Sequence, residues 1–143
     1  MINLGYACIN QTLSKDKITS NRTMIKRTFI AKGIPYCSEL ALQNTKDLFK
    51  IVKWNTRNKI NVFRMSSSIF PWMSEYELTD LQDWPEIKNI LKAIGKHAND
   101  NDVRLSFHPG PFNILCSPKK EVVEKTIKEL DQHSFILDTM GSV

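Results

Sequence analysis

Three stretches of the chain alternate apolar and polar residues with the period of a β-strand. They cover residues 2–7, 60–65 and 103–108. Each stretch is followed by apolar residues at helical spacing, which predicts a helix after every strand. A strand–helix unit repeated in this way is typical of an α/β fold with parallel strands and right-handed helical connections.

Capping residues predict where the helices begin and end. Ser38 is expected to cap the first helix, Asp83 the second, with Pro85 in its first turn, and Ser117 the third, which Gly141 ends. The predicted buried faces are Ala41, Asn44, Leu48, Ile51, Val52 and Asn55; then Ile87, Ile90, Leu91, Ile94 and Ala98; then Val123, Ile127, Leu130, Ser134 and Leu137. Residues 8–36 show no clean period and are expected to form a long, functional loop.

The strand at 103–108 has a polar face that ends in a histidine. Alternation places Phe107 on the apolar face and Ser106 and His108 on the polar one, and a Pro109-Gly110 turn follows directly. Because α/β folds place their sites at the carboxyl ends of strands, the His108 imidazole is a candidate for catalysis or ligand binding. A hydrogen-bonded structural histidine is the alternative.

The other two strand ends also carry polar or aromatic residues. Tyr6 and Asn10 belong to the first, and Arg64 and Ser66 to the second. Guanidinium and hydroxyl groups suit phosphate oxygens, and exposed rings suit stacking on bases, so a shared rim favours nucleic-acid or phosphate binding. Structural roles remain open: Arg64 can pair with a carboxylate, Tyr6 can belong to the core, and the serines can satisfy a turn.

The charge of the chain is concentrated in one segment. The 143 residues are the length of one domain and carry a formal charge of +5. Between residues 15 and 36, Asp16 is the only acidic residue, and the rest of the chain is balanced. Such a segment can neutralise phosphates, and a solvated loop is the equally open alternative. Its basic residues are Lys15, Lys17, Arg22, Lys26, Arg27 and Lys32.

Several classes of protein find no support in the sequence. No run approaches the ~18 apolar residues of a membrane span, and no leader pattern opens the chain, so we expect a cytoplasmic protein without a membrane partner. Gly-rich phosphate loops and a nucleophile-elbow serine are absent. Cys8, Cys37 and Cys116 form no CxxC pair and are expected to be reduced.

Five short motifs, in order along the chain, resemble those of the UV damage endonuclease family. They are Leu4-Gly5-Tyr6-x-Cys8-x-Asn10, Asn21-Arg22-Thr23, Asn44-x3-Leu48 with Asn55, Phe63-Arg64-Met65-Ser66-Ser67 with Pro71, and Leu105-Ser106-x-His108-Pro109-Gly110. The resemblance extends through residues 117–123 and so covers nearly the whole chain. It implies a (β/α)8 TIM barrel, with residues 1–143 forming about the first three βα units of an incomplete barrel.

The resemblance also implies an activity and the residues that carry it. The implied activity is a DNA repair endonuclease that cuts 5′ to ultraviolet photoproducts in double-stranded DNA, using divalent metal ions, with manganese as the expected metal. His108 matches a metal-binding histidine, and Tyr6 and Asn10 match residues placed against the damaged bases. Pro111 and Phe112 stand where the family has a glutamine and an aromatic residue that probe the duplex. One histidine cannot hold a metal cluster, so the other ligands are expected outside this chain.

The leading hypothesis is therefore a UV damage endonuclease or its amino-terminal portion, with Arg22, Arg64 and Ser66 as phosphate contacts. The open edges of a three-stranded parallel sheet are expected to pair with a complementing carboxyl-terminal half or with another copy. Two alternatives are a non-catalytic DNA-binding or assembly module and a sugar-isomerase-like barrel fragment.

Overall fold

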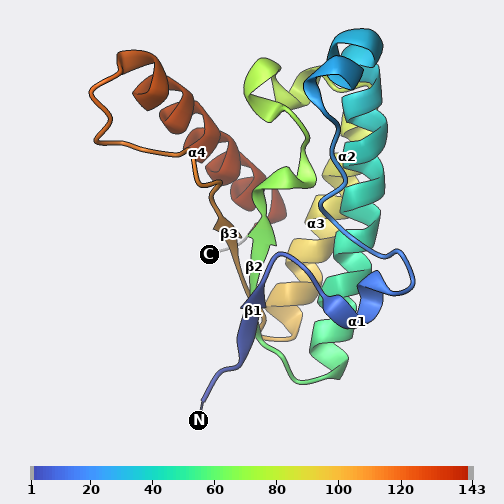
Figure 1. Cartoon of the computed structure of the whole chain (residues 1–143). Helices are drawn as coiled ribbons and strands as arrows, with labels where there is room; N and C mark the ends of the chain where they lie inside the picture. Colours follow the sequence, from blue (N-terminus) through green and yellow to red (C-terminus); the bar gives the residue numbers. More distant parts are fainter. Residues whose placement is uncertain (1, 142–143) are drawn as a thin grey trace.

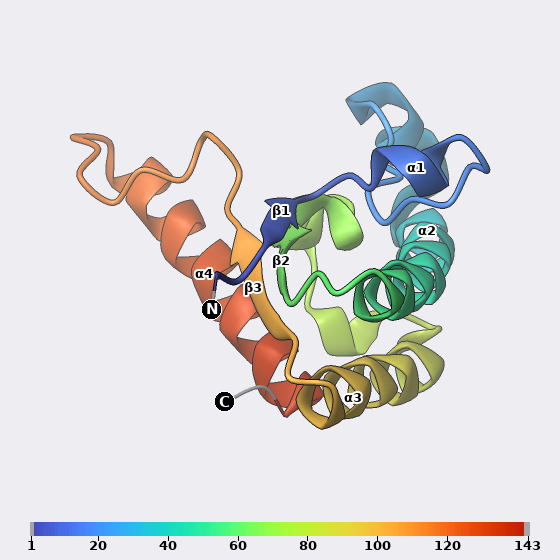
Figure 2. The same cartoon turned by 90° about the horizontal axis from the view of Figure 1, so that it is seen from below.

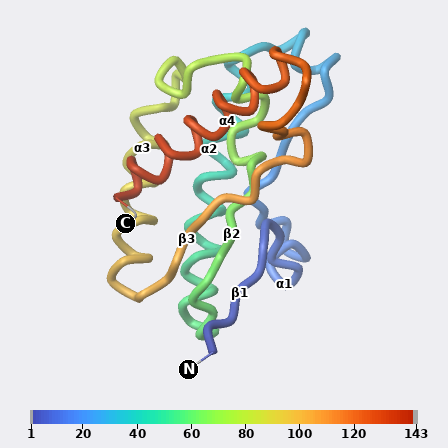
Figure 3. The backbone as a smooth tube through the Cα atoms, turned by 90° about the vertical axis from the view of Figure 1, so that its left-hand side faces the viewer, coloured from blue at the N-terminus to red at the C-terminus, as the bar shows by residue number. Residues whose placement is uncertain are grey.

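The computed structural model describes residues 2–141, in which three parallel strands alternate with helices. The strands β1 (Gly5–Ala7), β2 (Val62–Ser66) and β3 (Arg104–His108) form one sheet in the order β1-β2-β3 (Figure 1). Their carboxyl ends lie at the same edge of the sheet (Figure 3). The parallel α/β order predicted from the sequence is confirmed, although the first strand is shorter than 2–7.

The helices cover one face of this sheet and leave the other open. They are α1 (Gln11–Ser14), α2 (Lys26–Arg57), α3 (Trp84–Asp100) and α4 (Lys120–Met140), with 3₁₀ turns η1 (Ser67–Ile69), η2 (Met73–Glu75) and η3 (Leu78–Asp80) between β2 and α3. Figure 2 shows α2 and α3 on the same side of the strands, and α4 packs against α3. Phe63 and Met65 of β2 are fully buried beneath the helices, whereas Arg64 between them is exposed. The core therefore lies between the sheet and the helices.

The predicted buried faces of the first two long helices are largely confirmed. All the predicted positions of α2 are buried, and in α3 the exception is Ile90, which is half-buried. These faces could be predicted because their apolar residues recur at 3 and 4 positions, the repeat of an α-helix.

The start of α2 differs from the prediction. Residues 8–36, expected as an irregular loop, contain α1 and the first turns of α2. Gly33 interrupts α2 with φ 66° and ψ −160°, a conformation that glycine adopts without a steric penalty, and Pro35 follows. The break divides this part of the helix into short pieces, which explains why no single period runs through the sequence here.

Both predicted serine caps are wrong. Ser38 is buried inside α2, where its hydroxyl donates to Oδ2 of Asp83 (2.7 Å) and accepts the backbone N–H of Asp83 (2.9 Å). This pair ties α2 to the start of α3, where Asp83 holds the N-cap position without a side-chain capping bond. Ser117 lies before α4, whose N-cap residue is Lys119. Gly141 ends α4 in a left-handed conformation, as predicted.

The crossing of α3 and α4 is unusually close. A Cβ atom added at Gly95 would lie 1.7 Å from the carbonyl oxygen of Met140, so only glycine permits this approach. The crossing fixes which side of α4 faces the core.

The buried face of α4 is not the predicted one. Its buried residues are Thr126, Gln132, His133, Ile136 and Met140. Of the predicted face, Ile127 and Ser134 are exposed, and the other three residues are half-buried. Polar residues of α4 turn inward because they contact other elements: Thr126 contacts the loop after β3, Gln132 the segment around η2, and His133 the strand β3. An apolar pattern cannot reveal such contacts.

Candidate functional site

The open face of the sheet carries polar side chains toward its carboxyl edge. In the observed register Arg64 lies between Ala7 of β1 and Ser106 of β3, and Ser66 pairs with His108. Arg64 and His108 are exposed, while Ser66 is buried and its hydroxyl accepts the backbone N–H of Ser68 (3.1 Å). The structure thus brings Arg64, Ser66 and His108 together at one rim. Their roles toward phosphate and metal stay predictions.

A tight turn after β3 exposes an aromatic ring. The backbone and side-chain N–H groups of Asn113 both donate to the carbonyl oxygen of Gly110, at 3.3 and 3.1 Å. Pro111 and Phe112 occupy the tip between them, and Phe112 is 86% exposed. An exposed ring on a short, hydrogen-bonded turn can stack on bases or wedge between them.

Side chains of α4 hold this turn from behind. Thr126 Oγ1 accepts the backbone N–H of Ile114 (3.0 Å). Glu129 Oε1 lies 3.8 Å from the position that a Cβ atom would take at Gly110. Gly110, Phe112 and Glu129 also share the lining of a cavity of about 200 Å³. The turn therefore rests on α4 as well as on β3.

His133 is the residue near this turn that the sequence did not reveal. Its side chain is almost fully buried and its ring stacks on Phe107, with 4.2 Å between centroids and 2° between planes. Neither ring nitrogen has a hydrogen-bond partner within residues 2–141, and Glu129 Oε1 lies 3.9 Å from Nε2. Burial lowers the pKa of His133, and the Glu129 carboxylate raises it by less, so the neutral form is favoured.

A signal for His133 does exist in the sequence. Thr126, Glu129 and His133 recur at 3 and 4 residues, which is the spacing of one helix face. Their polar character does not show whether this face is buried. His133 is buried because it packs on the Phe107 ring of β3. A contact between a strand and a helix cannot be predicted from the sequence of either segment alone.

Tyr6 and Asn10 belong to a hydrogen-bonded chain on the helix side of β1. The Tyr6 hydroxyl donates to Oδ1 of Asn55 (2.6 Å) and accepts Nδ2 of Asn10 (2.8 Å), and Oδ1 of Asn10 accepts the N–H of Leu13 (2.9 Å). Burial raises the pKa of Tyr6 by more than these two amide contacts lower it. Both residues also line a shallow pocket beside Ile9, and their contact with damaged bases stays a prediction.

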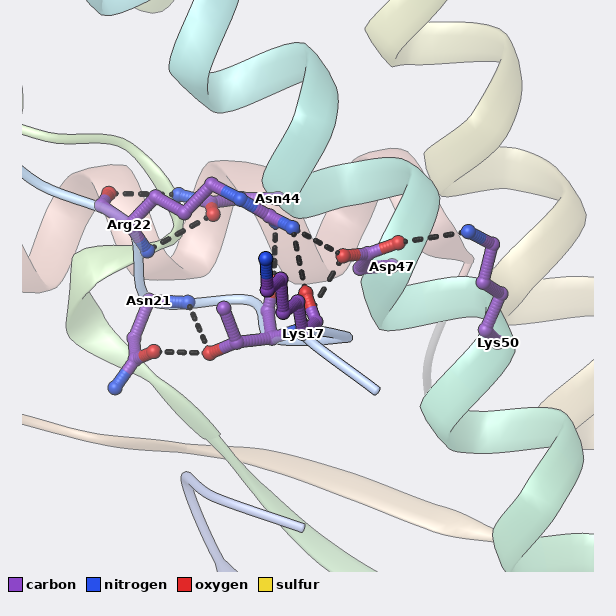
Figure 4. Close-up of polar contacts among 7 residues, drawn as sticks. Lys17, Asn21, Arg22, Asn44, Asp47 and Lys50 are labelled. Atoms are coloured by element: carbon purple, nitrogen blue, oxygen red, sulfur yellow. Dashed lines mark hydrogen bonds and ion pairs between the residues drawn. The ribbon is translucent and has the colours of Figure 1, made fainter. Parts of the chain in front are cut away.

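Arg22 makes a set of contacts that fasten the basic segment to α2 (Figure 4). Its guanidinium donates to Oδ2 of Asp47 (2.6 Å) and to the carbonyl oxygens of Thr19 and Lys17. Burial raises the pKa of Asp47, but hydrogen bonds from Arg22, Lys50 and the Thr19 N–H outweigh it, and the pKa is lowered overall. A phosphate would have to compete with these partners for the guanidinium of Arg22. The remaining cations of this segment are exposed: Lys15, Lys17, Lys26, Arg27 and Lys32.

Comparison with known proteins identifies the family. The sequence profile of the family described as UV-endonuclease UvdE matches residues 2–142. The chain belongs to this family.

Relatives and a solved structure agree with the UvdE assignment. The "Putative UV-damage endonuclease" of Acanthamoeba polyphaga mimivirus is 39% identical over 99% of this chain and 43% of the relative. The "UV-damage endonuclease" of Schizosaccharomyces pombe is 34% identical over 96% of this chain and 23% of the relative. The structure described as "Crystal Structure of SacUVDE" superposes with a TM-score of 0.85 at 28% identity, covering 99% of this chain and 47% of that one. The fold is that of a partial α/β barrel, and the chain spans less than half the length of these UvdE relatives.

The UvdE family raises the question of which described residues could bind a metal ion. Within residues 2–141, no group of three His, Cys, Asp or Glu side chains is arranged to hold a metal ion. His108 is exposed at the rim and can offer one imidazole nitrogen, so the described residues do not by themselves form a metal site.

Among residues 2–141, no helix combines the length and the apolar character that a membrane span requires.

Proposed function

We propose that the chain forms the amino-terminal βα units of a DNA repair endonuclease that incises ultraviolet-damaged duplex DNA 5′ to the lesion. The observation that carries the proposal is the UvdE match over residues 2–142, combined with an exposed His108 at the rim of the open sheet face. Divalent metal ions, manganese in our proposal, supply Lewis-acid chemistry for phosphodiester hydrolysis when bound. The ligands beyond His108 come from a complementing carboxyl-terminal half.

The chain's own residues take distinct parts in this proposal. Arg64, exposed between Ala7 and Ser106, neutralises a phosphate. Phe112 enters the stack of a distorted duplex. Pro111 carries no side-chain amide that could bond to a base edge, so recognition by this turn relies on the ring and on the shape of the DNA.

Incision of irradiated DNA tests the proposal. The chain is mixed with the part of the mimivirus relative that it does not match, and manganese is added to irradiated and undamaged plasmid. We expect nicks in the irradiated plasmid alone, and none after chelation. His108→Ala should abolish nicking, while His97→Gln should keep it, because His97 lies on α3 beside Thr56. Equal nicking of both plasmids, or none by the unaltered mixture, would contradict the proposal.

A second candidate is a DNA-binding module that does not cut. The exposed cations of the basic segment favour it, since they neutralise phosphates without any metal. For such a module, a plot of the logarithm of DNA affinity against the logarithm of salt concentration falls with a slope of about 0.9 per phosphate contact. We expect the double substitution Lys26→Ala with Arg27→Ala to make this slope shallower. Lys96→Ala on α3 is the control. Binding without incision in the complemented mixture would favour this candidate. Nothing within residues 2–141 favours the sugar-isomerase alternative.

A further inference from the structure

A groove between α4 and η3 stands apart from the candidate site. It encloses about 530 Å³ and shares no lining residue with the rim around His108. Its apolar walls are formed by Leu78, Ile127 and Phe135. Charged residues surround these walls: Glu77, Glu124, Lys128 and Asp131.

The apolar walls are preformed and accessible. Ile127 is 47% exposed and Phe135 is 42% exposed. The Phe135 ring stacks on Trp84 of α3, with 5.6 Å between centroids, so it is held in place without a ligand. The hydrophobic pattern of α4 predicts Ile127 on a buried face, whereas the structure leaves it open to the groove. Exposed apolar side chains gathered in a concave surface are typical of binding sites.

The charge of the groove is opposite to that of the chain. Its lining holds three carboxylates and one lysine, Lys128, which lies 3.5 Å from Glu77. Outside the lining, the exposed Lys120 lies 3.6 Å from Glu124, a pair that an occupant's cation would replace. In a chain of formal charge +5, this surface repels phosphates and attracts cations. Nucleic acid and anionic lipid are therefore unsuitable occupants, and a basic polypeptide is a suitable one.

Gln132 also lines the groove. Gln132 Nε2 donates to the carbonyl oxygens of Met73 (2.7 Å) and Tyr76 (3.2 Å), which fixes the orientation of the amide. Its Oε1 atom is buried and has no partner in the part of the chain that the structure describes.

We propose that this groove docks a basic, amphipathic segment of a partner protein. An apolar side chain of the segment packs between Ile127 and Phe135, and flanking lysine or arginine heads pair with Glu124 and Asp131. The site is independent of the DNA-cutting rim, so it can hold a partner while the rim engages DNA.

Fluorescence anisotropy with a labelled peptide of alternating leucine and lysine pairs tests this proposal on the full chain. We expect saturable binding that weakens with salt, and no binding of the same peptide with glutamate in place of lysine. The variant Glu124→Lys with Asp131→Lys should weaken binding by about tenfold or more, because both attractions become repulsions. The control is Glu121→Lys with Asp138→Lys, an equal charge change on exposed positions of α4 outside the groove, which should bind like the unaltered chain.

Three results would overturn the proposal. They are equal weakening in the control variant, equal binding of the acidic peptide, and unchanged binding in the groove variant, whose fold circular dichroism verifies. Sedimentation of the chain alone tests a second copy as the occupant. A concentration-dependent dimer that Glu124→Lys with Asp131→Lys abolishes would assign the groove to self-association instead of a partner protein.

Discussion

Single side chains determine how α4 packs against β3, and His133 is the clearest case. Its ring packs flat on Phe107, and neither nitrogen has a partner within residues 2–141. A proton on this ring would place a charge in a desolvated position, which the Glu129 carboxylate at 3.9 Å offsets only in part. The folded state therefore favours the neutral imidazole.

Stability should fall in mild acid because of His133. Its folded pKa lies below the ordinary 6.5, so below that pH the unfolded chain binds more protons than the folded one. The free energy of unfolding should decrease as the pH falls from 6.5 toward the folded pKa, and should be flat above 6.5. Urea unfolding at a series of pH values measures this. His133→Phe keeps a ring against Phe107 and should remove the dependence, and an identical dependence in the variant would contradict the assignment. The pKa of Asp47 is lowered by folding, so its carboxylate also makes the free energy of unfolding decrease in acid, but only as the pH falls below its ordinary pKa of 3.8.

Arg22 allows a structural role to be separated from a phosphate-binding one. Arg22→Met leaves the largely buried Asp47 carboxylate with fewer partners and should lower the free energy of unfolding by about 2 kcal/mol. Lys50→Met removes the exposed partner of the same carboxylate and should cost less than about 1 kcal/mol. Chemical denaturation compares the two variants. Equal stabilities would mean that the Arg22 contacts do not fasten the basic segment to α2.

At the level of elements, apolar periodicity predicted α2 and α3 well and α4 poorly. The first two helices bury regular apolar faces, such as Leu48 with Ile51 and Ile87 with Ile94. In α4 the orientation is set by contacts with other elements: the crossing at Gly95 and the stack of His133 on Phe107. Long-range contacts of this kind leave no periodic signal in the sequence.

Gly95→Ala tests the close crossing of α3 and α4. Alanine favours a helix over glycine by about 1 kcal/mol, so the substitution would stabilise an uncrowded helix. Here the added Cβ meets the Met140 carbonyl, and we expect a net loss of about 1–3 kcal/mol as α4 is pushed away. Asn89→Ala, at an exposed position of α3, is the control and should not destabilise. A more stable Gly95→Ala protein, by thermal unfolding, would show that the two helices do not meet this closely.

For the molecule as a whole, the repeated strand–helix order predicted the parallel sheet, and the motifs at the strand ends predicted the UvdE family. The sequence could also place Arg64, Ser66 and His108 at one rim, because parallel strands bring their carboxyl ends together. It could not predict that Tyr6 and Arg22 are held by side chains within the chain, since their partners Asn55 and Asp47 lie on α2, far along the sequence. In the proposed function, recognition of DNA therefore relies chiefly on Phe112, Arg64 and His108, which are exposed.

The affinity of the chain for a duplex with one ultraviolet photoproduct, relative to the same duplex undamaged, tests this account most directly. We predict tighter binding to the damaged duplex, because a weakened stack is easier for the exposed Phe112 ring to enter. Phe112→Ala should remove the preference and keep the salt-dependent binding of undamaged DNA, whereas Phe135→Ala in the groove of α4 should leave the preference unchanged. Equal affinity of the unaltered chain for both duplexes, or a preference that survives Phe112→Ala, would contradict the account.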